Sequence, residues 1–190
     1  MHFSPMAFLI LTALGCGDTD KKPASTEAPA VDLTEVLEDS EVRAGIVTDE
    51  AALFGGISAE GRLGDIKIYN SRVQFVIQAP GDSSYYIGYG GSVADADIIR
   101  PTGQPGQDLI DDGCTMVGLG RMFNAESVTV INDGQDGEAA VVRATGGVSP
   151  LTILTGTLEA NGLIQDRDVK ITVDYILEPD SHLLKLESTV

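Results

Sequence analysis

Apolar and polar residues alternate with a period of two through most of the chain after residue 40, and this pattern predicts β-strands. In residues 169–177 the odd positions are apolar and most even positions are polar, and residues 178–181 then supply turn-forming side chains. The pattern predicts three hairpins: 65–69 with 73–77, 127–131 with 139–143, and 169–177 with 184–190. No long segment of the sequence repeats its apolar residues at helical spacing.

Strands joined by short connections without helices between them favour an all-β fold, an antiparallel β-sandwich over residues 41–190. A closed barrel is the second choice. Residues 79–120 fit the alternation least well, because glycine and proline interrupt them repeatedly. Long irregular loops in compact domains often carry function, so we expect a site in this region first.

The N-terminus combines an apolar, uncharged run at residues 6–14 with Cys16, after which the chain becomes polar at once. This arrangement resembles the lipobox of bacterial lipoproteins, with Gly15 as the small residue before the cysteine. The resemblance implies that residues 1–15 are a signal peptide and that Cys16 becomes the lipidated N-terminus. The run is less than half of the about 20 apolar residues that a transmembrane helix needs. A secretory signal without lipid and a buried N-terminal helix are the alternatives, and the absence of Lys and Arg before Cys16 departs from usual export signals.

Residues 16–40 are expected to be the lipid anchor followed by an acidic, disordered tether. They contain few large apolar groups, and the acidic residues among them outnumber the basic ones, so self-repulsion favours an extended chain. In the lipoprotein resemblance, aspartate directly after the cysteine retains the protein in the inner membrane. Gly17 stands there instead, which favours the outer membrane of a bacterial cell envelope.

The charge of the chain restricts its partners. It has 12 basic and 29 acidic residues, a net charge of −17. Nucleic acid is therefore an unsuitable partner, because binding it requires a basic surface that neutralises phosphates. Binding of the acidic protein surface to anionic lipid headgroups is unfavourable for the same reason. The acyl chains on Cys16 would therefore provide the attachment to the membrane.

The sequence offers few groups for catalysis. Its two histidines are His2, in the signal segment, and His182, beside a predicted turn. The motifs of serine hydrolases and of P-loop nucleotide-binding proteins do not occur. Cys114 has no partner for a disulfide if Cys16 is lipidated, and its apolar surroundings predict a buried, inert thiol. The leading interpretation is an extracytoplasmic, non-enzymatic binding or scaffold module whose ligand is a glycan or a protein.

Acidic residues gather in two places where calcium, which takes six to eight oxygen ligands, is a candidate ligand. One group lies in the irregular region and the other in a predicted hairpin turn. The competing interpretation is a solvated acidic loop in the first case and a turn built from turn-forming residues in the second. The candidate ligands are Asp95, Asp97, Asp108, Asp111, Asp112, Asp133 and Asp136.

A further resemblance involves residues 61–66 and 70–78, which look like the opening of β-rich N-terminal regions in large predicted bacterial surface lipoproteins. Residues 175–179, before an alternating strand, are similar to galactose-mutarotase-like supersandwich domains. This resemblance implies a supersandwich-like fold. It also implies an alternative function as an accessory domain of a larger hydrolase, either carbohydrate-active or metal-dependent of the PHP type. No metal ligand of such a hydrolase can be placed on this sequence.

The alternation continues to Val190 without a closing turn or polar tail. We therefore expect that Val190 is not the boundary of the fold and that further strands follow it; the alternative is that this last strand lies at a sheet edge. An unpaired strand of this kind is prone to pair with another chain through its exposed edge.

Overall fold

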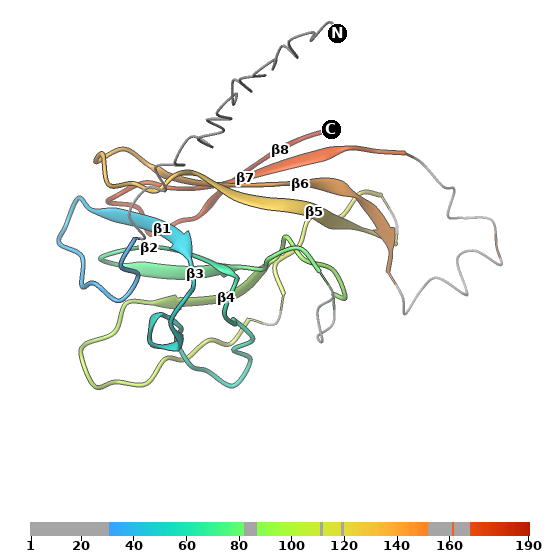
Figure 1. The fold of residues 1–190 in the computed structure, drawn as a ribbon. Coiled ribbons are helices and arrows are strands. Elements are labelled where there is room, and N and C mark those ends of the chain that lie inside the picture. Colours follow the sequence, from blue (N-terminus) through green and yellow to red (C-terminus); the bar gives the residue numbers. More distant parts are fainter. Residues whose placement is uncertain (1–30, 82–86, 111, 119, 152–160, 162–167) are drawn as a thin grey trace, which may run out of the picture.

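A computed structural model describes residues 31–81, 87–110, 112–118, 120–151, 161 and 168–190. These residues form eight strands in two four-stranded antiparallel sheets, which confirms the all-β sandwich (Figure 1). The first sheet contains β1 (Val42–Ile46), β2 (Ile66–Asn70), β3 (Val73–Ile77) and β4 (Val93–Ile98), in that order. The second contains β5 (Arg121–Asn132), β6 (Ala140–Pro150), β7 (Ile171–Leu177) and β8 (Lys185–Thr189). A short 3₁₀ helix, η1 (Glu50–Ala52), follows β1.

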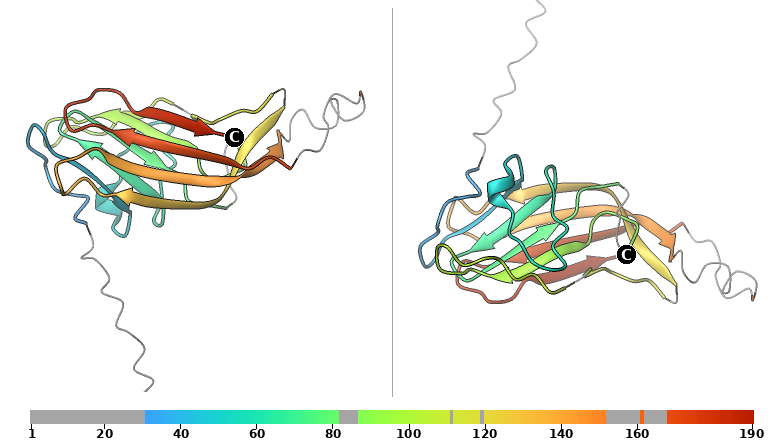
Figure 2. Two further views of the ribbon diagram at one scale, coloured as in Figure 1. Left: turned by 90° about the horizontal axis from the view of Figure 1, so that it is seen from above. Right: turned by 90° about the horizontal axis from the view of Figure 1, so that it is seen from below.

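The core lies between the two sheets, as the period-two pattern requires. Along β7 the odd-numbered residues are buried and the even-numbered ones are half-buried, so one face of the strand packs inward. Tyr175 and Phe123 are the largest fully buried side chains of this layer. Strand β1 packs over β5 and β6, and β2 packs over β6 and β7. The two sheets are therefore stacked with their strands roughly aligned, as Figure 2 shows from above and below.

The three predicted hairpins are confirmed by the strand registers. Ile68 pairs with Phe75 in the first hairpin, and Tyr175 pairs with Leu186 in the last. The middle hairpin is longer than the sequence indicated, because β5 and β6 continue past two β-bulges in β5. Gly146 lies at the first bulge, where a Cβ atom would collide with the Asn124 carbonyl oxygen. A side chain at this position would therefore prevent the close pairing of the two strands.

Strand β4 lies inside the region 79–120, for which the sequence predicted irregular structure. It pairs antiparallel with β3, with a shift in register after Val76. Residues 94–98 do alternate, with Asp95 and Asp97 on the outer side, but the glycines and prolines on both sides of this short strand interrupt the pattern. Asp95 is fully buried beneath a loop. Its carboxylate accepts hydrogen bonds from the backbone N–H groups of Glu60 and Gly61. The outer side of β4 therefore does not look like a solvent-exposed face.

The last ten residues of the expected tether belong to the folded domain. We call residues 31–40 the strap, and they lie on the outer side of the first sheet. Leu33 and Leu37 are 4% and 6% exposed, and they pack with Val47, Ala52 and Tyr69 in a second small core. Residues 31–40 therefore pack on the sheet, although they were expected to be tether, and the burial of Leu33 and Leu37 contributes to holding them there.

The turns at one end of the two sheets are joined by the buried side chain of Asn70. Its Nδ2 donates to the carbonyl oxygens of Glu178 and Ser181, in the turn between β7 and β8. Its Oδ1 accepts from the backbone N–H groups of Arg72 and Val73, in the turn between β2 and β3. Asn70 is 0% exposed, and one amide therefore uses both of its polar atoms to fix both turns.

Candidate functional site

A groove of about 600 Å³ lies on the outer side of the first sheet and is the candidate functional site. We call it the outer groove. The strap forms one wall, residues 51–55 and 99–106 form others, and β2 and β3 provide the floor. The lining mixes aliphatic surface from Leu53 and Ile99 with the polar side chains of Gln74 and Gln104. The groove is therefore an open, mixed-polarity surface rather than an enclosed apolar cavity.

Lys67 occupies the floor of the outer groove, on the side of β2 that faces away from the core. Its side chain is 6% exposed, and its Nζ donates to the carbonyl oxygens of Ala52 at 2.8 Å and Leu33 at 3.2 Å. The Nζ also lies 4.5 Å from the centre of the Tyr69 ring, in a cation–π contact. Burial lowers the pKa of Lys67 to about 8. The ammonium therefore connects the strap to η1, and its bonds to carbonyls leave it as a structural cation rather than a nucleophile.

Tyr69 lies two residues further along the same face of β2. Its hydroxyl is within hydrogen-bond distance of the carbonyl oxygens of Glu35, at 3.1 Å, and Asp32, at 3.3 Å. Burial, together with the nearby charge of Glu35, raises the pKa of Tyr69 to about 12. The phenol is therefore a neutral donor at ordinary pH. Lys67 and Tyr69 together hold the strap by its backbone carbonyl groups, in addition to the packing of the Leu33 and Leu37 side chains.

Arg100 lines the outer groove, and its ion-pair partner Asp97 lies near the end of β4. The guanidinium of Arg100 donates two hydrogen bonds to the Asp97 carboxylate, at 2.7 and 2.9 Å. The same carboxylate accepts from the backbone N–H of Gln107 at 2.8 Å. Although burial alone would raise it, these hydrogen bonds hold the pKa of Asp97 below its usual value. The pair fixes both ends of the loop 99–107, which gives the groove a preformed edge.

The remaining calcium candidates of the irregular region also bind backbone groups. The fully buried Asp108 accepts from the N–H of Ala96 at 2.9 Å, and Asp112 accepts from that of Ile87 at 3.1 Å. Burial raises the pKa of Asp95, and the charges of Asp108 and Asp65 add to this effect. Asp111 lies outside the described residues. In this loop-rich region the carboxylates accept hydrogen bonds from backbone N–H groups that have no neighbouring strand to pair with.

Asp133 and Asp136 form the turn between β5 and β6, as their competing interpretation predicted. Asp133 accepts from the backbone and side chain of Gln135, and Asp136 accepts from the Asn132 side chain and the N–H of Glu138. Such local bonds from aspartate to backbone are typical of turns. In the part of the chain that the structure describes, no group of three or more His, Cys, Asp or Glu residues is placed to bind a metal ion.

Cys114 is half-buried and free, and it packs beside a small core of Ile87, Met122 and Leu151. Burial and the neighbouring carboxylate of Asp112 raise the pKa of its thiol, which disfavours the reactive thiolate. His182 is exposed in the turn before β8, where its Nε2 lies 3.4 Å from a guanidinium nitrogen of Arg72. Cys16 lies outside the described residues, so its lipidation stays a prediction.

Sequence reasoning missed Lys67, Tyr69 and Asn70, the three residues that organise this side of the molecule. In the alternating pattern, Lys67 is simply a polar residue on the outer face of a strand. The available signal was the spacing of Leu33 and Leu37 in an otherwise polar segment, which requires an apolar partner somewhere in the fold.

No helix within the described residues is long and apolar enough to cross a membrane. Comparison with known protein families, with curated proteins and with solved structures found no match to this chain.

Proposed function

We propose that this chain is a lipid-anchored extracytoplasmic binding module that presents its β-sandwich close to a membrane. The observation that carries the proposal is the strap. The backbone is fixed on the first sheet by Lys67 and Tyr69, beginning at Asp32, and the lipobox-like Cys16 precedes it. A pulling force transmitted from the anchor would therefore act on the strap, which hydrogen bonds and the buried Leu33 and Leu37 side chains hold on the first sheet.

The length of chain before the strap limits how far the domain lies from its anchor. Val31 follows Cys16 by 15 positions, and a fully extended chain spans at most about 3.6 Å per residue. Val31, where the strap begins, therefore stays within about 54 Å of the lipidated Cys16. Of the walls of the outer groove, the strap is the one nearest to the anchor along the chain. A ligand fixed in the same layer of the envelope would therefore be close enough to enter the groove.

The proposed ligand of the outer groove is a neutral glycan strand. The groove is open and of mixed polarity, which suits a polymer with both hydroxyl-bearing edges and apolar ring faces. The net charge of −17 disfavours polyanions, and the two cations of the groove already have partners in Asp97 and in backbone carbonyls.

Two experiments test the two parts of this proposal. Labelled fatty acid should be incorporated into the wild-type chain and not into Cys16→Ala. Equal release of both forms into the soluble fraction would contradict the anchor. For the ligand, the Cys16→Ala chain is applied to a glycan and peptidoglycan array.

A pair of matched variants then locates the binding surface. Thr102→Trp places a large ring in the outer groove, and Thr172→Trp places the same ring on the outer side of the second sheet. We expect Thr102→Trp to weaken binding at least tenfold and Thr172→Trp to leave it unchanged. Equal effects of the two variants, or an array without any bound glycan, would refute the groove as the binding site.

A further inference from the structure

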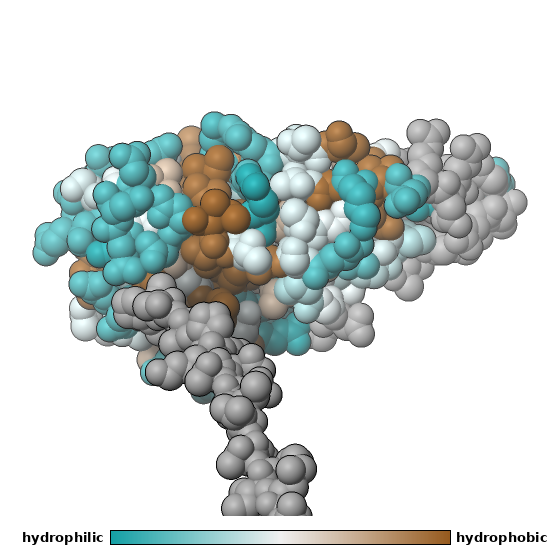
Figure 3. All heavy atoms as spheres, turned by 45° about the horizontal axis from the view of Figure 1, so that its top comes forward, coloured by the Kyte–Doolittle hydropathy of each residue, from teal (hydrophilic) through white to brown (hydrophobic). Residues whose placement is uncertain are grey.

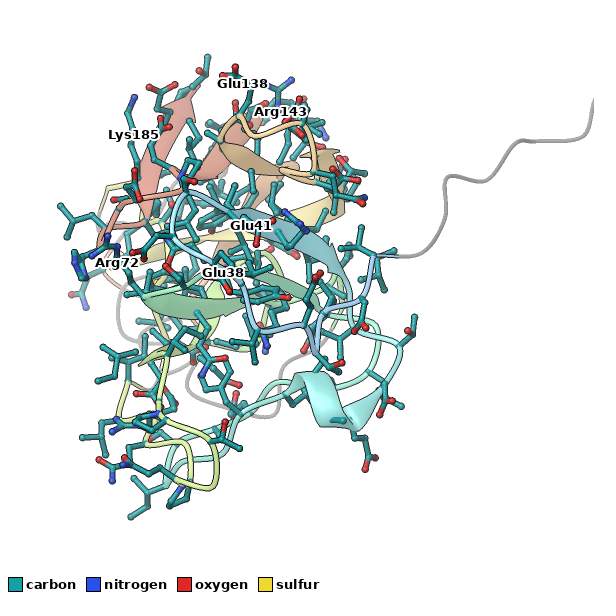
Figure 4. All side chains as sticks on the ribbon, turned by 90° about the vertical axis from the view of Figure 1, so that its left-hand side faces the viewer. Glu38, Glu41, Arg72, Glu138, Arg143 and Lys185 are labelled. Carbon is teal, nitrogen blue, oxygen red and sulfur yellow. The ribbon has the colours of Figure 1, made fainter. Side chains whose placement is uncertain are left out.

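Among the strands that the structure describes, β8 lies at the edge of the second sheet. All five of its residues are exposed, and within the described part of the chain it pairs only with β7. An edge strand presents a row of backbone N–H and C=O groups that can pair with another strand. Figure 4 shows Lys185 and Arg143 on the outer side of the second sheet, away from Glu38 and Glu41. The edge is therefore accessible from the solvent.

The core is also incompletely covered along this side of the sandwich. Leu186 pairs with the buried Tyr175, which places it on the inner side of β8, and yet it is 45% exposed. Ile98 pairs with Val73 on the inner side of β4 and is 56% exposed. Because β4 and β8 are the last strands of two aligned sheets, both side chains lie at the same open edge.

On the outer side of the second sheet, the side chains of β8 differ in character from those of β5, β6 and β7. Figure 3 shows a hydrophobic band on the side of the molecule that includes this face. Ile131 near the end of β5 is 54% exposed, and Val141 of β6 pairs with Ile176 of β7. Beside this pair lies the ion pair of Arg143 with Asp174, at 2.7 Å. On β8 the charges change to Lys185 and Glu187, whose ion pair lies within one strand and leaves both side chains more than half exposed.

The order of charges on β8 favours one way of pairing with a second copy. Residues directly opposite in an antiparallel pair lie on the same face, so a two-fold axis must pass midway between the two copies of one residue. An axis at Ser188 brings no two charged side chains opposite each other. An axis at Lys185 or at Glu187 places two like charges opposite each other. An axis at Leu186 places Lys185 opposite Glu187 in both halves of the pair and brings the two Leu186 side chains together.

We propose that two copies of this chain associate through β8, antiparallel and centred on Leu186, to form one continuous eight-stranded sheet. The occupant of the edge is thus a second copy, because the charge sequence of β8 is complementary to itself. The contact covers Leu186 on the inner side and pairs Lys185 with Glu187 of the partner subunit on the outer side.

Salt has a definite effect on this dimer. Each copy carries a net charge of −17, so the two copies repel each other over a distance set by the ionic strength. The screening length is about 30 Å at 0.01 M salt and about 8 Å at 0.15 M. The dimer therefore becomes more stable as salt is added across this range, since the long-range repulsion is screened before the two short-range ion pairs.

Sedimentation equilibrium of the full chain carrying Cys16→Ala tests the proposal. We expect a monomer–dimer equilibrium at 0.15 M salt that shifts to monomer at 0.01 M. Lys185→Glu and Glu187→Lys should each weaken association at least tenfold, because each places like charges opposite each other. The double variant Lys185→Glu/Glu187→Lys should restore it. Lys170→Glu, which breaks an exposed ion pair on the same face, is the control and should have no effect.

A thermal melt of each variant separates loss of folding from loss of pairing, and the double variant restores the pairing only if the register is correct. A purely monomeric chain at 100 µM in 0.15 M salt would overturn the proposal. Single variants that dimerise like the wild type, or a double variant that stays monomeric, would overturn it as well.

Discussion

Replacing Asn70 by alanine should destabilise the sandwich strongly, because this one side chain fixes a turn of each sheet. The side chain is 0% exposed and makes four hydrogen bonds: to the carbonyl oxygens of Glu178 and Ser181 at 3.0 and 2.8 Å, and from the N–H groups of Arg72 and Val73 at 2.8 and 3.0 Å. Asn70→Ala leaves all four backbone groups without this partner.

The expected loss follows from the exposure of those groups. A buried polar group left unpaired costs about 1–3 kcal/mol. The lower value applies to Asn70, because three of the four hydrogen bonds are only partly buried and water can reach the turns. The Glu178 carbonyl oxygen still accepts from the Ser181 N–H in the variant, so three groups lose their partner, which gives about 3 kcal/mol. For a domain of this length, each 1 kcal/mol lowers Tm by about 2–4 °C, so the expected fall is roughly 6–12 °C.

Urea denaturation followed by circular dichroism measures this loss. The control is Asn124→Ala, which removes a half-buried amide with a single hydrogen bond to Ser149 at 2.9 Å, and it should cost about 1 kcal/mol. In Asn70→Asp, a carboxylate oxygen would face two carbonyl oxygens, so its pKa in the folded state lies above that of an unfolded aspartate. Relative to wild type, this variant should therefore recover stability as the pH falls towards about 4. A loss below about 1 kcal/mol for Asn70→Ala, or a pH-independent deficit in Asn70→Asp, would refute the reasoning.

Three further predictions concern buried polar groups. Tyr175→Phe removes a hydroxyl that donates to the Gly91 carbonyl oxygen at 2.5 Å in the core, and it should lower the free energy of unfolding by about 1–2 kcal/mol in urea titrations. Lys67→Met should release the strap and accelerate its cleavage by a glutamate-specific protease, whereas an unchanged rate would show that Leu33 and Leu37 hold the strap alone. The folded-state pKa of Lys67, about 8, lies below its unfolded value of about 10.5, so the folded state binds fewer protons between these values. The stability of the wild type relative to Lys67→Met should therefore rise between pH 8 and pH 10.5, and a constant difference would contradict the burial of the ammonium.

The sequence by itself determined the hairpins and the fold class. Period-two alternation in residues 65–77 and 169–190 leaves only a strand with one buried face, and the turn residues between the segments fix which strands are neighbours. These signals are local, because each hairpin is closed within a short stretch of chain. The net charge of −17 and the lipobox-like surroundings of Cys16 can likewise be read without a fold.

The tertiary structure alone decided which polar residues are buried. Alternation distinguishes the two faces of a strand, but it does not reveal whether a loop covers the outer one. Lys67, Tyr69 and Asp95 lie on outer faces and are buried because the strap and residues 60–61 pack over them. These contacts join residues 34 or 35 positions apart, and no local pattern encodes them. The sequence therefore specified the sheets, and the long-range packing of loops on those sheets specified the outer groove and the position of the strap.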